Sequence, residues 1–260
     1  MTEPRVCVLR AAGVNCNEET AFAFERAGAE VREIHVNQLL ESPKLLGEFG
    51  AVAIPGGFSY GDDIAAGRIL ALEIDETLGE AFRSLVERGG LVIGICNGFQ
   101  VLIKSGLLPG PSPDGPPIRA TLRDNASHRY EDRWVRLRPD PSLCLFLNDD
   151  DELELPAAHA EGRFTVADES DLERLASDRR VALRYLGPEP GPAPYPFNPN
   201  GSAGDVAAIV DATGQVLGMM PHPERALFPW QHPRWTRERG RRTQGDGARI
   251  FENAVRHLRA

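Results

Sequence analysis

Residues 89–106 read GGLVIGICNGFQVLIKSG and join an apolar run to an amphipathic stretch through a glycine, a cysteine and a second glycine. The run before Cys96 predicts a buried strand, and the stretch after it predicts a helix. In open parallel sheets, reactive groups gather where strands end. Gly94 and Gly98 flank Cys96 at the spacing of a nucleophile elbow, with cysteine in place of serine. This stretch therefore predicts an α/β fold and a candidate nucleophile together.

The first half of the chain alternates strand-like and helix-like segments around this stretch. Parallel strands connected by helices produce such an alternation, with right-handed crossovers and helices on both faces. We therefore expect a mostly parallel, doubly wound (flavodoxin-like) sheet. The expected strands are 5–11, 29–36, 50–57 and 91–96, and the expected helices are 21–28 and 69–90.

The second half changes character after a loop rich in proline and glycine at 107–122. Short alternating segments at 133–139 and 163–166 predict antiparallel strands added beside the sheet. Residues 205–220 predict a hairpin that turns at Thr213 and Gly214. Further elements are expected at 168–178 (helix), 180–186 (strand) and 247–258 (helix). We find no repeat and no sharp change of composition, so the expected organisation is a single domain over residues 1–260.

Composition places the chain among ordinary soluble globular proteins. Of its 260 residues 42% are hydrophobic, and the formal net charge of −9 argues against a general nucleic-acid surface. No run approaches the roughly 18 apolar residues that span a membrane, and the first residues lack a signal-peptide pattern. The four cysteines form no C-x-x-C pair, so we expect no disulfide framework, no metal site and a cytoplasmic location. The basic segment 234–249 is interpreted as a solvated loop.

The glycines beside Cys96 have a steric reason if this cysteine is a nucleophile. A sharp strand-to-helix turn brings backbones together and leaves no room for a Cβ. It also sets the thiol at a helix N-terminus, where partial positive charge favours the thiolate. The backbone N–H of Asn97 is then a natural oxyanion donor. The alternative is a buried structural thiol, the commonest fate of a free cysteine, but it leaves the two glycines unexplained.

A thiolate nucleophile needs a base, and the base needs a group to orient it. His222 is the leading candidate, because MMPHPER at 219–225 follows directly on the last strand of the hairpin. Glu224 lies two residues on and could hold the imidazole tautomer. A histidine near a glutamate usually lies on the surface and has no function. Together with the predicted elbow, however, this pair completes a Cys-His-Glu arrangement.

The other histidines give weaker signals. His159 is a second candidate for the base. His35 and His257 lie in expected elements and are interpreted as structural. His128 and His232 receive no role from the sequence.

The loop IPGGFSYGDD at 54–63 supplies a third part. It ends an expected parallel strand with two glycines, so its free N–H groups could face the same site as Cys96. Most Gly-Gly turns are only tight turns. Because of its position, we interpret the N–H of Gly57 as the second oxyanion donor.

The motifs GICNGFQ and PHPE resemble those of the class I (triad) glutamine amidotransferases. The likeness covers nearly the whole chain and is greatest to the glutaminase subunits of a purine-biosynthetic synthase. The matching segments are LRAAGVNCNEETAFAFERAGAEV at 9–31, PGGFSYGDD at 55–63, GICNGFQVL at 94–102, AHAEGRF at 158–164, NPNGS at 198–202 and GQVLGMMPHPERA at 214–226.

The resemblance implies specific roles for these residues. Cys96 would be the nucleophile, His222 the base and Glu224 its partner. Gly57 and Asn97 would form the oxyanion hole. Phe58 and Gln100 would lie near the bound glutamine.

The resemblance also implies partners and cofactors. This chain would carry no cofactor, because ATP and Mg²⁺ would bind to a separate synthetase subunit that receives the ammonia. A small accessory subunit would complete the assembly. No nucleic acid or membrane partner is expected.

Two features depart from the family pattern. The family tends to have His-Gly-Glu-Gly where this chain has His-Ala-Glu-Gly at 159–162. A glutamine contact at Ala160 is therefore in question. The segment 230–247 is longer than in compact members and receives no role. Two alternatives remain open from the residues: a related cysteine hydrolase or amidotransferase with another substrate, and a catalytically silent regulatory subunit.

Overall fold

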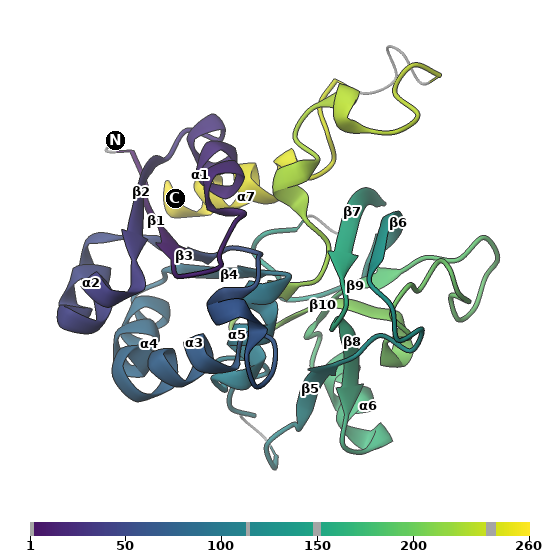
Figure 1. Ribbon diagram of the computed structural model, residues 1–260, viewed down its shortest axis with the longest axis horizontal. Coiled ribbons are helices and arrows are strands. Elements are labelled where there is room, and N and C mark those ends of the chain that lie inside the picture. The colour runs from purple at the N-terminus through teal and green to yellow at the C-terminus, as the bar shows by residue number, and fades with distance from the viewer. Residues whose placement is uncertain (1–2, 113–114, 148–151, 238–242) are drawn as a thin grey trace.

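The computed structural model describes residues 3–112, 115–147, 152–237 and 243–260, and shows an α/β architecture (Figure 1). Within these residues, nine strands form one sheet in the order β2-β1-β3-β4-β11-β10-β9-β6-β7. The strands of this sheet are β1 Arg5–Arg10, β2 Glu30–His35, β3 Ala51–Ile54, β4 Leu91–Ile95, β6 Glu131–Pro139, β7 Leu153–His159, β9 Val181–Tyr185, β10 Val206–Val210 and β11 Val216–Met219.

One half of this sheet is parallel. Strands β2, β1, β3, β4 and β11 pair side by side in the same direction. Figure 1 shows α1 and α7 on one face of this half and α3, α4 and α5 on the other. The α-helices among the described residues are α1 Asn17–Arg26, α2 Val36–Glu41, α3 Arg68–Glu73, α4 Gly79–Glu87, α5 Asn97–Lys104, α6 Glu169–Ser177 and α7 Ala248–Leu258. This arrangement confirms the predicted doubly wound fold.

The other half is antiparallel. β10 pairs with β11 and β9, and β6 pairs with β9 and β7. The hairpin of β10 and β11 turns as expected, with Gly214 at a φ of 77°. The antiparallel strand predicted at 133–139 is therefore present in this half, as β6.

The strand predicted at 163–166 differs in one respect. It is β8 (Arg163–Val166), and it pairs with β5 (Ala120–Arg123) in a separate two-stranded sheet. After β7, Gly162 packs against the ring of His159 so closely that a Cβ would lie 2.4 Å from Nδ1.

Two further elements differ from expectation. The helix predicted at 69–90 is α3 and α4 joined by a π-helical turn at Ile74–Leu78. Helix α2 was not predicted, because six residues are too few to show a helical period. It begins where the ring of His35 accepts a hydrogen bond from the N–H of Asn37 at 3.2 Å, so His35 has a structural role.

Helices of the described residues are all too short or too polar to cross a membrane. Part of the basic segment 234–249, namely residues 238–242, lies outside the described residues.

Candidate active site

Cys96 lies in the turn between β4 and α5, with a φ of 51° and a ψ of −104°. Such a left-handed backbone is rare for a residue with a side chain and marks a constrained turn. A Cβ on Gly98 would lie 1.9 Å from the carbonyl oxygen of Ile54, and one on Gly94 would lie 2.5 Å from that of Gly98. Both glycines are therefore required by the close approach of β3, β4 and α5.

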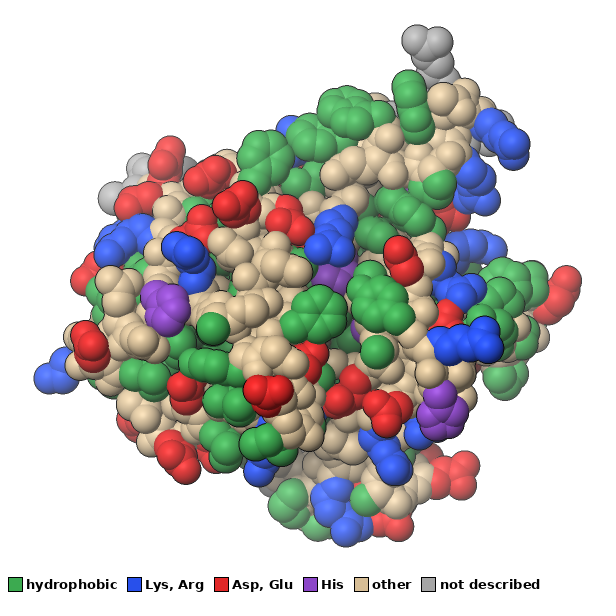
Figure 2. All heavy atoms as spheres, in the orientation of Figure 1, with side chains coloured by type: hydrophobic (Ala, Val, Ile, Leu, Met, Phe, Trp, Pro, Cys, Tyr) green, Lys and Arg blue, Asp and Glu red, His purple; other side chains and the backbone are tan. Residues whose placement is uncertain are grey.

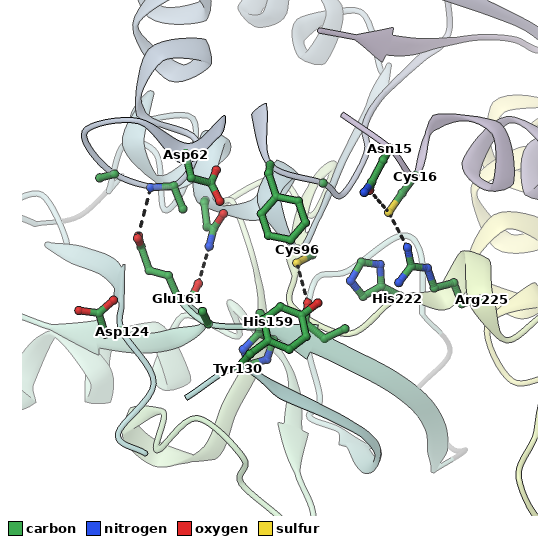
Figure 3. Close-up of a pocket in the computed structure, with 17 residues that line it drawn as sticks. Asn15, Cys16, Asp62, Cys96, Asp124, Tyr130, His159, Glu161, His222 and Arg225 are labelled. Atoms are coloured by element: carbon green, nitrogen blue, oxygen red, sulfur yellow. Dashed lines mark hydrogen bonds between the residues drawn. The ribbon is translucent and has the colours of Figure 1, made fainter. Parts of the chain in front are cut away.

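His222 reaches the same place because β4 and β11 are parallel neighbours. Ile95 pairs with Met219, and the N–H of Cys96 donates to the carbonyl of Met219 at 2.8 Å. The chain then continues for three residues to His222. Figure 3 shows the imidazole beside the sulfur of Cys96. Residues far apart in the sequence thus converge where two adjacent strands end.

Glu224 holds the imidazole from the other side. Nδ1 of His222 lies 2.6 Å from Oε1 of Glu224, and both side chains are buried. Burial alone would lower the pKa of His222, but the carboxylate of Glu224 and the sulfur of Cys96 outweigh it and raise that pKa well above its ordinary value. The positive charge of a protonated imidazole favours the thiolate form of a neighbouring cysteine.

The loop after β3 approaches the elbow. Gly57 has a φ of 140°, and a Cβ there would lie 2.8 Å from the backbone of Gly13 and Asn15. Its N–H donates no hydrogen bond to any residue that the structure describes. The N–H of Asn97, the first residue of α5, has no acceptor within its helix. Both donors predicted for the oxyanion hole are therefore free of competing backbone bonds.

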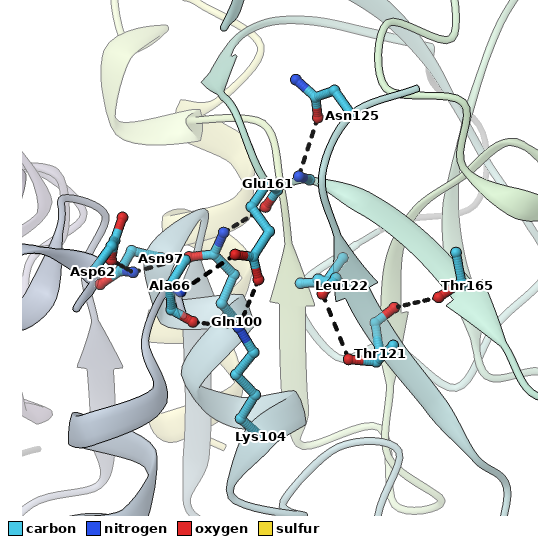
Figure 4. Close-up of polar contacts among 11 residues, drawn as sticks. Asp62, Ala66, Asn97, Gln100, Lys104, Thr121, Leu122, Asn125, Glu161 and Thr165 are labelled. Carbon is cyan, nitrogen blue, oxygen red and sulfur yellow. Dashed lines mark hydrogen bonds and ion pairs between the residues drawn. The ribbon is translucent and has the colours of Figure 1, made fainter. Parts of the chain in front are cut away.

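The side chain of Asn97 ties this loop to α5 (Figure 4). Its Oδ1 accepts from the N–H of Ser59 at 3.0 Å. Its Nδ2 donates to Asp62 at 3.1 Å and to Oε1 of Gln100 at 2.9 Å. Asn97 therefore fixes the spacing between the two backbone donors.

A cavity of about 430 Å³ opens above the sulfur of Cys96. Figure 2 shows histidine side chains set back between hydrophobic side chains near the centre of this face. Phe58 lies at the cavity with 46% of its surface exposed, whereas Gln100 is buried in the cavity wall. The lining residues are Asn15, Cys16, Gly57, Phe58, Asp62, Ala65, Ala66, Cys96, Gln100, Asp124, Tyr130, Ala158, His159, Ala160, Glu161, His222 and Arg225.

The opposite wall comes from the end of β7. The carbonyl of Ala158 accepts a long hydrogen bond of 3.6 Å from the thiol of Cys96. His159 lies buried behind it, with Nδ1 3.1 Å from Oδ1 of Asn125. Burial lowers the pKa of His159 to about 4. This histidine is neutral at neutral pH, and no carboxylate among the described residues is hydrogen-bonded to its ring, so it is the poorer candidate for the base.

An ion pair connects this wall to helix α5. Nζ of Lys104 lies 2.6 Å from Oε1 of Glu161, and the N–H of Ala66 donates to Oε2 of Glu161 at 3.2 Å (Figure 4). Gln100 donates to the carbonyl of Glu161 through Nε2. The side chain of Gln100 is therefore held in the cavity wall by partners on both sides.

Sequence reasoning missed several residues of this site. Cys16 and Tyr130 line the cavity, and Nη2 of Arg225 lies 3.0 Å from the sulfur of Cys16. Cys16 could have been suspected, because it follows the first strand of a parallel sheet as Cys96 follows the fourth. Tyr130 gave no such signal, since its loop is positioned by tertiary contacts alone.

Comparisons with known proteins agree over the length of the chain. The CobB/CobQ-like glutamine amidotransferase domain matches residues 3–258. A protein of Dehalococcoides mccartyi, named phosphoribosylformylglycinamidine synthase subunit PurQ, is 46% identical across all of this chain and 99% of its own length. A protein of the same name from Methanococcus maripaludis is 38% identical across 98% of this chain and 97% of its own.

Solved structures show the same architecture. The structure of PurLQS from Thermotoga maritima includes a chain that superposes with a TM-score of 0.71 and 28% identity, covering 99% of this chain and 100% of that one. A glutamine amidotransferase of Methylobacillus flagellatus superposes with a TM-score of 0.54 at 18% identity, which supports the fold alone.

Proposed function

The chain belongs to the CobB/CobQ-like glutamine amidotransferase family, and from this premise we propose that it is the glutaminase subunit of phosphoribosylformylglycinamidine synthase. It hydrolyses glutamine to glutamate and supplies the ammonia for purine biosynthesis. One observation carries this proposal: a cysteine at a constrained strand-to-helix turn shares a cavity with a buried histidine whose Nδ1 lies 2.6 Å from a buried carboxylate.

The proposed chemistry begins at Cys96. Its thiolate attacks the side-chain amide carbon of glutamine, and the N–H groups of Gly57 and Asn97 stabilise the tetrahedral oxyanion. His222 gives its proton to the amide nitrogen, which leaves as ammonia while the carbon–nitrogen bond breaks. A γ-glutamyl thioester remains on Cys96.

Water completes the cycle. His222, now neutral, takes a proton from water as the oxygen attacks the thioester carbon. The carbon–sulfur bond breaks, glutamate leaves and the thiolate is restored. Glu224 keeps the imidazole in the tautomer that both steps require. Phe58 and Gln100 contact the glutamine, which is supported by their places in the cavity wall.

The ammonia passes to a synthetase subunit. That partner binds ATP and Mg²⁺ and converts formylglycinamide ribonucleotide to formylglycinamidine ribonucleotide. A small accessory subunit belongs to the same assembly, which the relative in PurLQS supports. We assign this function to residues 1–260 as a single glutaminase domain in the cytoplasm.

Replacing Cys96 by alanine tests the assignment. In the complex reconstituted with the synthetase, we expect Cys96→Ala to lower the glutamine-dependent rate about 10⁴-fold or more, because no nucleophile remains. The rate with ammonium in place of glutamine should be retained. Cys144→Ala is the matched control, since Cys144 is buried away from the cavity. Continued use of glutamine by Cys96→Ala would refute the assigned nucleophile.

A further inference from the structure

Asp62 contributes a carboxylate to the cavity that the proposed reaction does not use. Its Oδ1 accepts from Nδ2 of Asn97 at 3.1 Å, but no lysine or arginine among the described residues forms an ion pair with it. Lys104 influences Asp62 through its charge, yet its Nζ lies 2.6 Å from Oε1 of Glu161 and 2.5 Å from the carbonyl of Ala66. Lys104 is therefore engaged elsewhere, and the charge of Asp62 keeps no cationic contact within the described chain.

The surroundings of Asp62 make this charge costly. Burial raises the pKa of Asp62, and the negative charge of Glu161 adds to the effect. The N–H of Gly67 and the charge of Lys104 act in the opposite direction and do not outweigh it. A cationic group on a bound ligand would supply the charge that the protein does not place beside this carboxylate.

Asp62 lies beside Gln100, about one helical turn from the nucleophile. Nδ2 of Asn97 donates both to Asp62 and to Oε1 of Gln100 (Figure 4). The N–H of Gln100 donates to the carbonyl of Cys96, so these two residues are one turn apart, about 5 Å along the axis of α5. Figure 3 shows Asp62 and Arg225 on opposite sides of Cys96.

The proposed reaction sets the direction in which the substrate lies. The amide carbon of glutamine meets the sulfur of Cys96, its oxygen faces the N–H of Asn97, and its leaving nitrogen faces His222. The rest of the molecule therefore extends away from His222, toward the side of Asp62. The α-ammonium nitrogen is four bonds from the amide carbon, a reach of about 5 Å that matches one helical turn.

The charges on this side of the cavity favour a cation. Asp62, Asp124 and Glu161 line this side, whereas the single lysine or arginine among the lining residues is Arg225, on the other side (Figure 3). The α-carboxylate of glutamine needs hydrogen-bond donors instead. The N–H groups of Ala160 and Glu161 line the same cavity and donate to no residue that the structure describes. The α-ammonium can thus face Asp62 while the α-carboxylate faces these N–H groups.

The loop holds Asp62 in this place before a substrate binds. Tyr60 and Asp62 both have a φ of 55°, in the left-handed region that is uncommon for residues with a side chain. The hydroxyl of Tyr60 donates to Oε2 of Glu73 at 2.8 Å and anchors the loop to α3. Asparagine tolerates a left-handed backbone well and keeps an oxygen for the bond from Asn97. Asp62→Asn therefore removes the charge with little change of shape.

We propose that the carboxylate of Asp62 binds the α-ammonium group of glutamine and makes the site selective for amides that carry this group. The inference rests on the proposed glutaminase function. Asp62 takes no part in bond making or breaking. Its contact is the same in the substrate and the transition state, so it should affect KM and kcat/KM more than kcat.

The test compares two amides in the assembled complex: glutamine, and glutaramate, which is glutamine without its α-amino group. The wild type should prefer glutamine by at least about tenfold in kcat/KM. We expect Asp62→Asn to lower kcat/KM for glutamine at least about tenfold, because a hydrogen bond to a charged group is lost, and to change that for glutaramate less than about threefold. The inhibition constant of glutaramate against glutamine gives its affinity where its turnover is slow, and it should also change little.

Asp63→Asn is the matched control. It removes the same charge one residue along the chain, but Asp63 is exposed and does not line the cavity. Its preference for glutamine should equal that of the wild type. Thermal unfolding checks that both variants are folded.

The possible outcomes separate this role from others. A loss of equal size for both amides would show that Asp62 acts through Asn97 and would overturn the proposal. Equal kcat/KM for the two amides in the wild type would overturn it without any variant. A wild-type complex that uses ammonium but not glutamine would refute the proposed function. Glutamine use with an unchanged preference in Asp62→Asn would refute only the role of Asp62.

Discussion

The two walls of the cavity each contain a buried histidine, and the two histidines differ in charge. On the wall from the parallel half of the sheet, His222 faces the carboxylate of Glu224. On the wall from the antiparallel half, His159 faces the neutral amide of Asn125. The pKa of His222 is raised well above its ordinary value despite burial, whereas burial lowers that of His159 to about 4. The charge of the partner thus determines which buried histidine can carry a proton.

The comparison is tested most strongly by removing the charge that distinguishes the two walls. We expect Glu224→Gln to lower kcat for glutamine about 10³- to 10⁴-fold, because the imidazole loses the carboxylate that fixes its tautomer and stabilises its protonated form. The measurement is glutamine-dependent product formation by the complex. The ammonium-dependent rate serves as the control and should not fall. A loss below about tenfold would mean that Glu224 does not orient His222.

Each wall also has a glycine in close contact, and the contacts differ in kind. A Cβ on Gly98 would meet the backbone oxygen of Ile54 at 1.9 Å, but one on Gly162 would meet the side chain of His159 at 2.4 Å. We expect Gly98→Ala to lower the free energy of unfolding by about 3 kcal/mol or more, and Gly162→Ala by less.

Chemical denaturation gives both values. Gly47→Ala is the control, since nothing lies within 4 Å of a Cβ there. Equal losses for Gly98→Ala and Gly162→Ala would show that the elbow is no more constrained than the opposite wall.

These contacts also explain how much the sequence could predict. Gly94, Cys96 and Gly98 lie close enough in the sequence for their spacing to indicate the turn. His222 and Glu224 are likewise only two residues apart. The parallel half of the fold follows from the alternation of strands and helices, and the structure confirms it. The roles of the site residues stay predictions.

Other features depend on tertiary contacts that leave no local pattern. Strand β8 pairs with β5, a segment far from it in the sequence, and residues 163–166 alone do not show that partner. The convergence of Cys96 and His222 depends on β11 lying next to β4. Cys16 and Tyr130 belong to loops whose places are set by the folded chain.

The opposite signs of the two pKa shifts predict different responses to pH. The pKa of His159 is an ordinary 6.5 in the unfolded chain and about 4 in the folded protein. As pH falls, the unfolded chain therefore binds a proton at this residue before the folded protein does. His159 therefore costs stability between these values, by about 2 to 3 kcal/mol near pH 4.5. The raised pKa of His222 has the reverse effect on stability. The stabilisation that His222 provides is complete below its pKa in the unfolded chain and is lost as pH rises through its pKa in the folded protein.

His159→Gln should remove the acid-sensitive part. Between neutral pH and about pH 4.5, the free energy of unfolding should fall by about 2 to 3 kcal/mol less in the variant than in the wild type, whatever the stability of the variant at neutral pH. Urea denaturation at both pH values provides the measurement. Identical losses in the two proteins would show that His159 titrates normally when folded.

The smallest effect is expected at the mouth of the cavity. Phe58 is 46% exposed, so Phe58→Leu should leave folding intact while reducing contact with glutamine. We expect KM for glutamine to rise about three- to tenfold with kcat nearly constant, because such a contact contributes equally to substrate and transition state. Steady-state kinetics would contradict this if kcat fell and KM did not change.

Asn97 and Gly98 form an Asn-Gly pair, the dipeptide most prone to spontaneous deamidation. The reaction needs the glycine nitrogen to reach the side-chain carbon, but the three hydrogen bonds of the Asn97 amide hold that group toward Ser59, Asp62 and Gln100. The fold therefore protects Asn97 from deamidation. When the turn loosens, deamidation would set a new carboxylate beside Asp62, and the damage would persist after refolding.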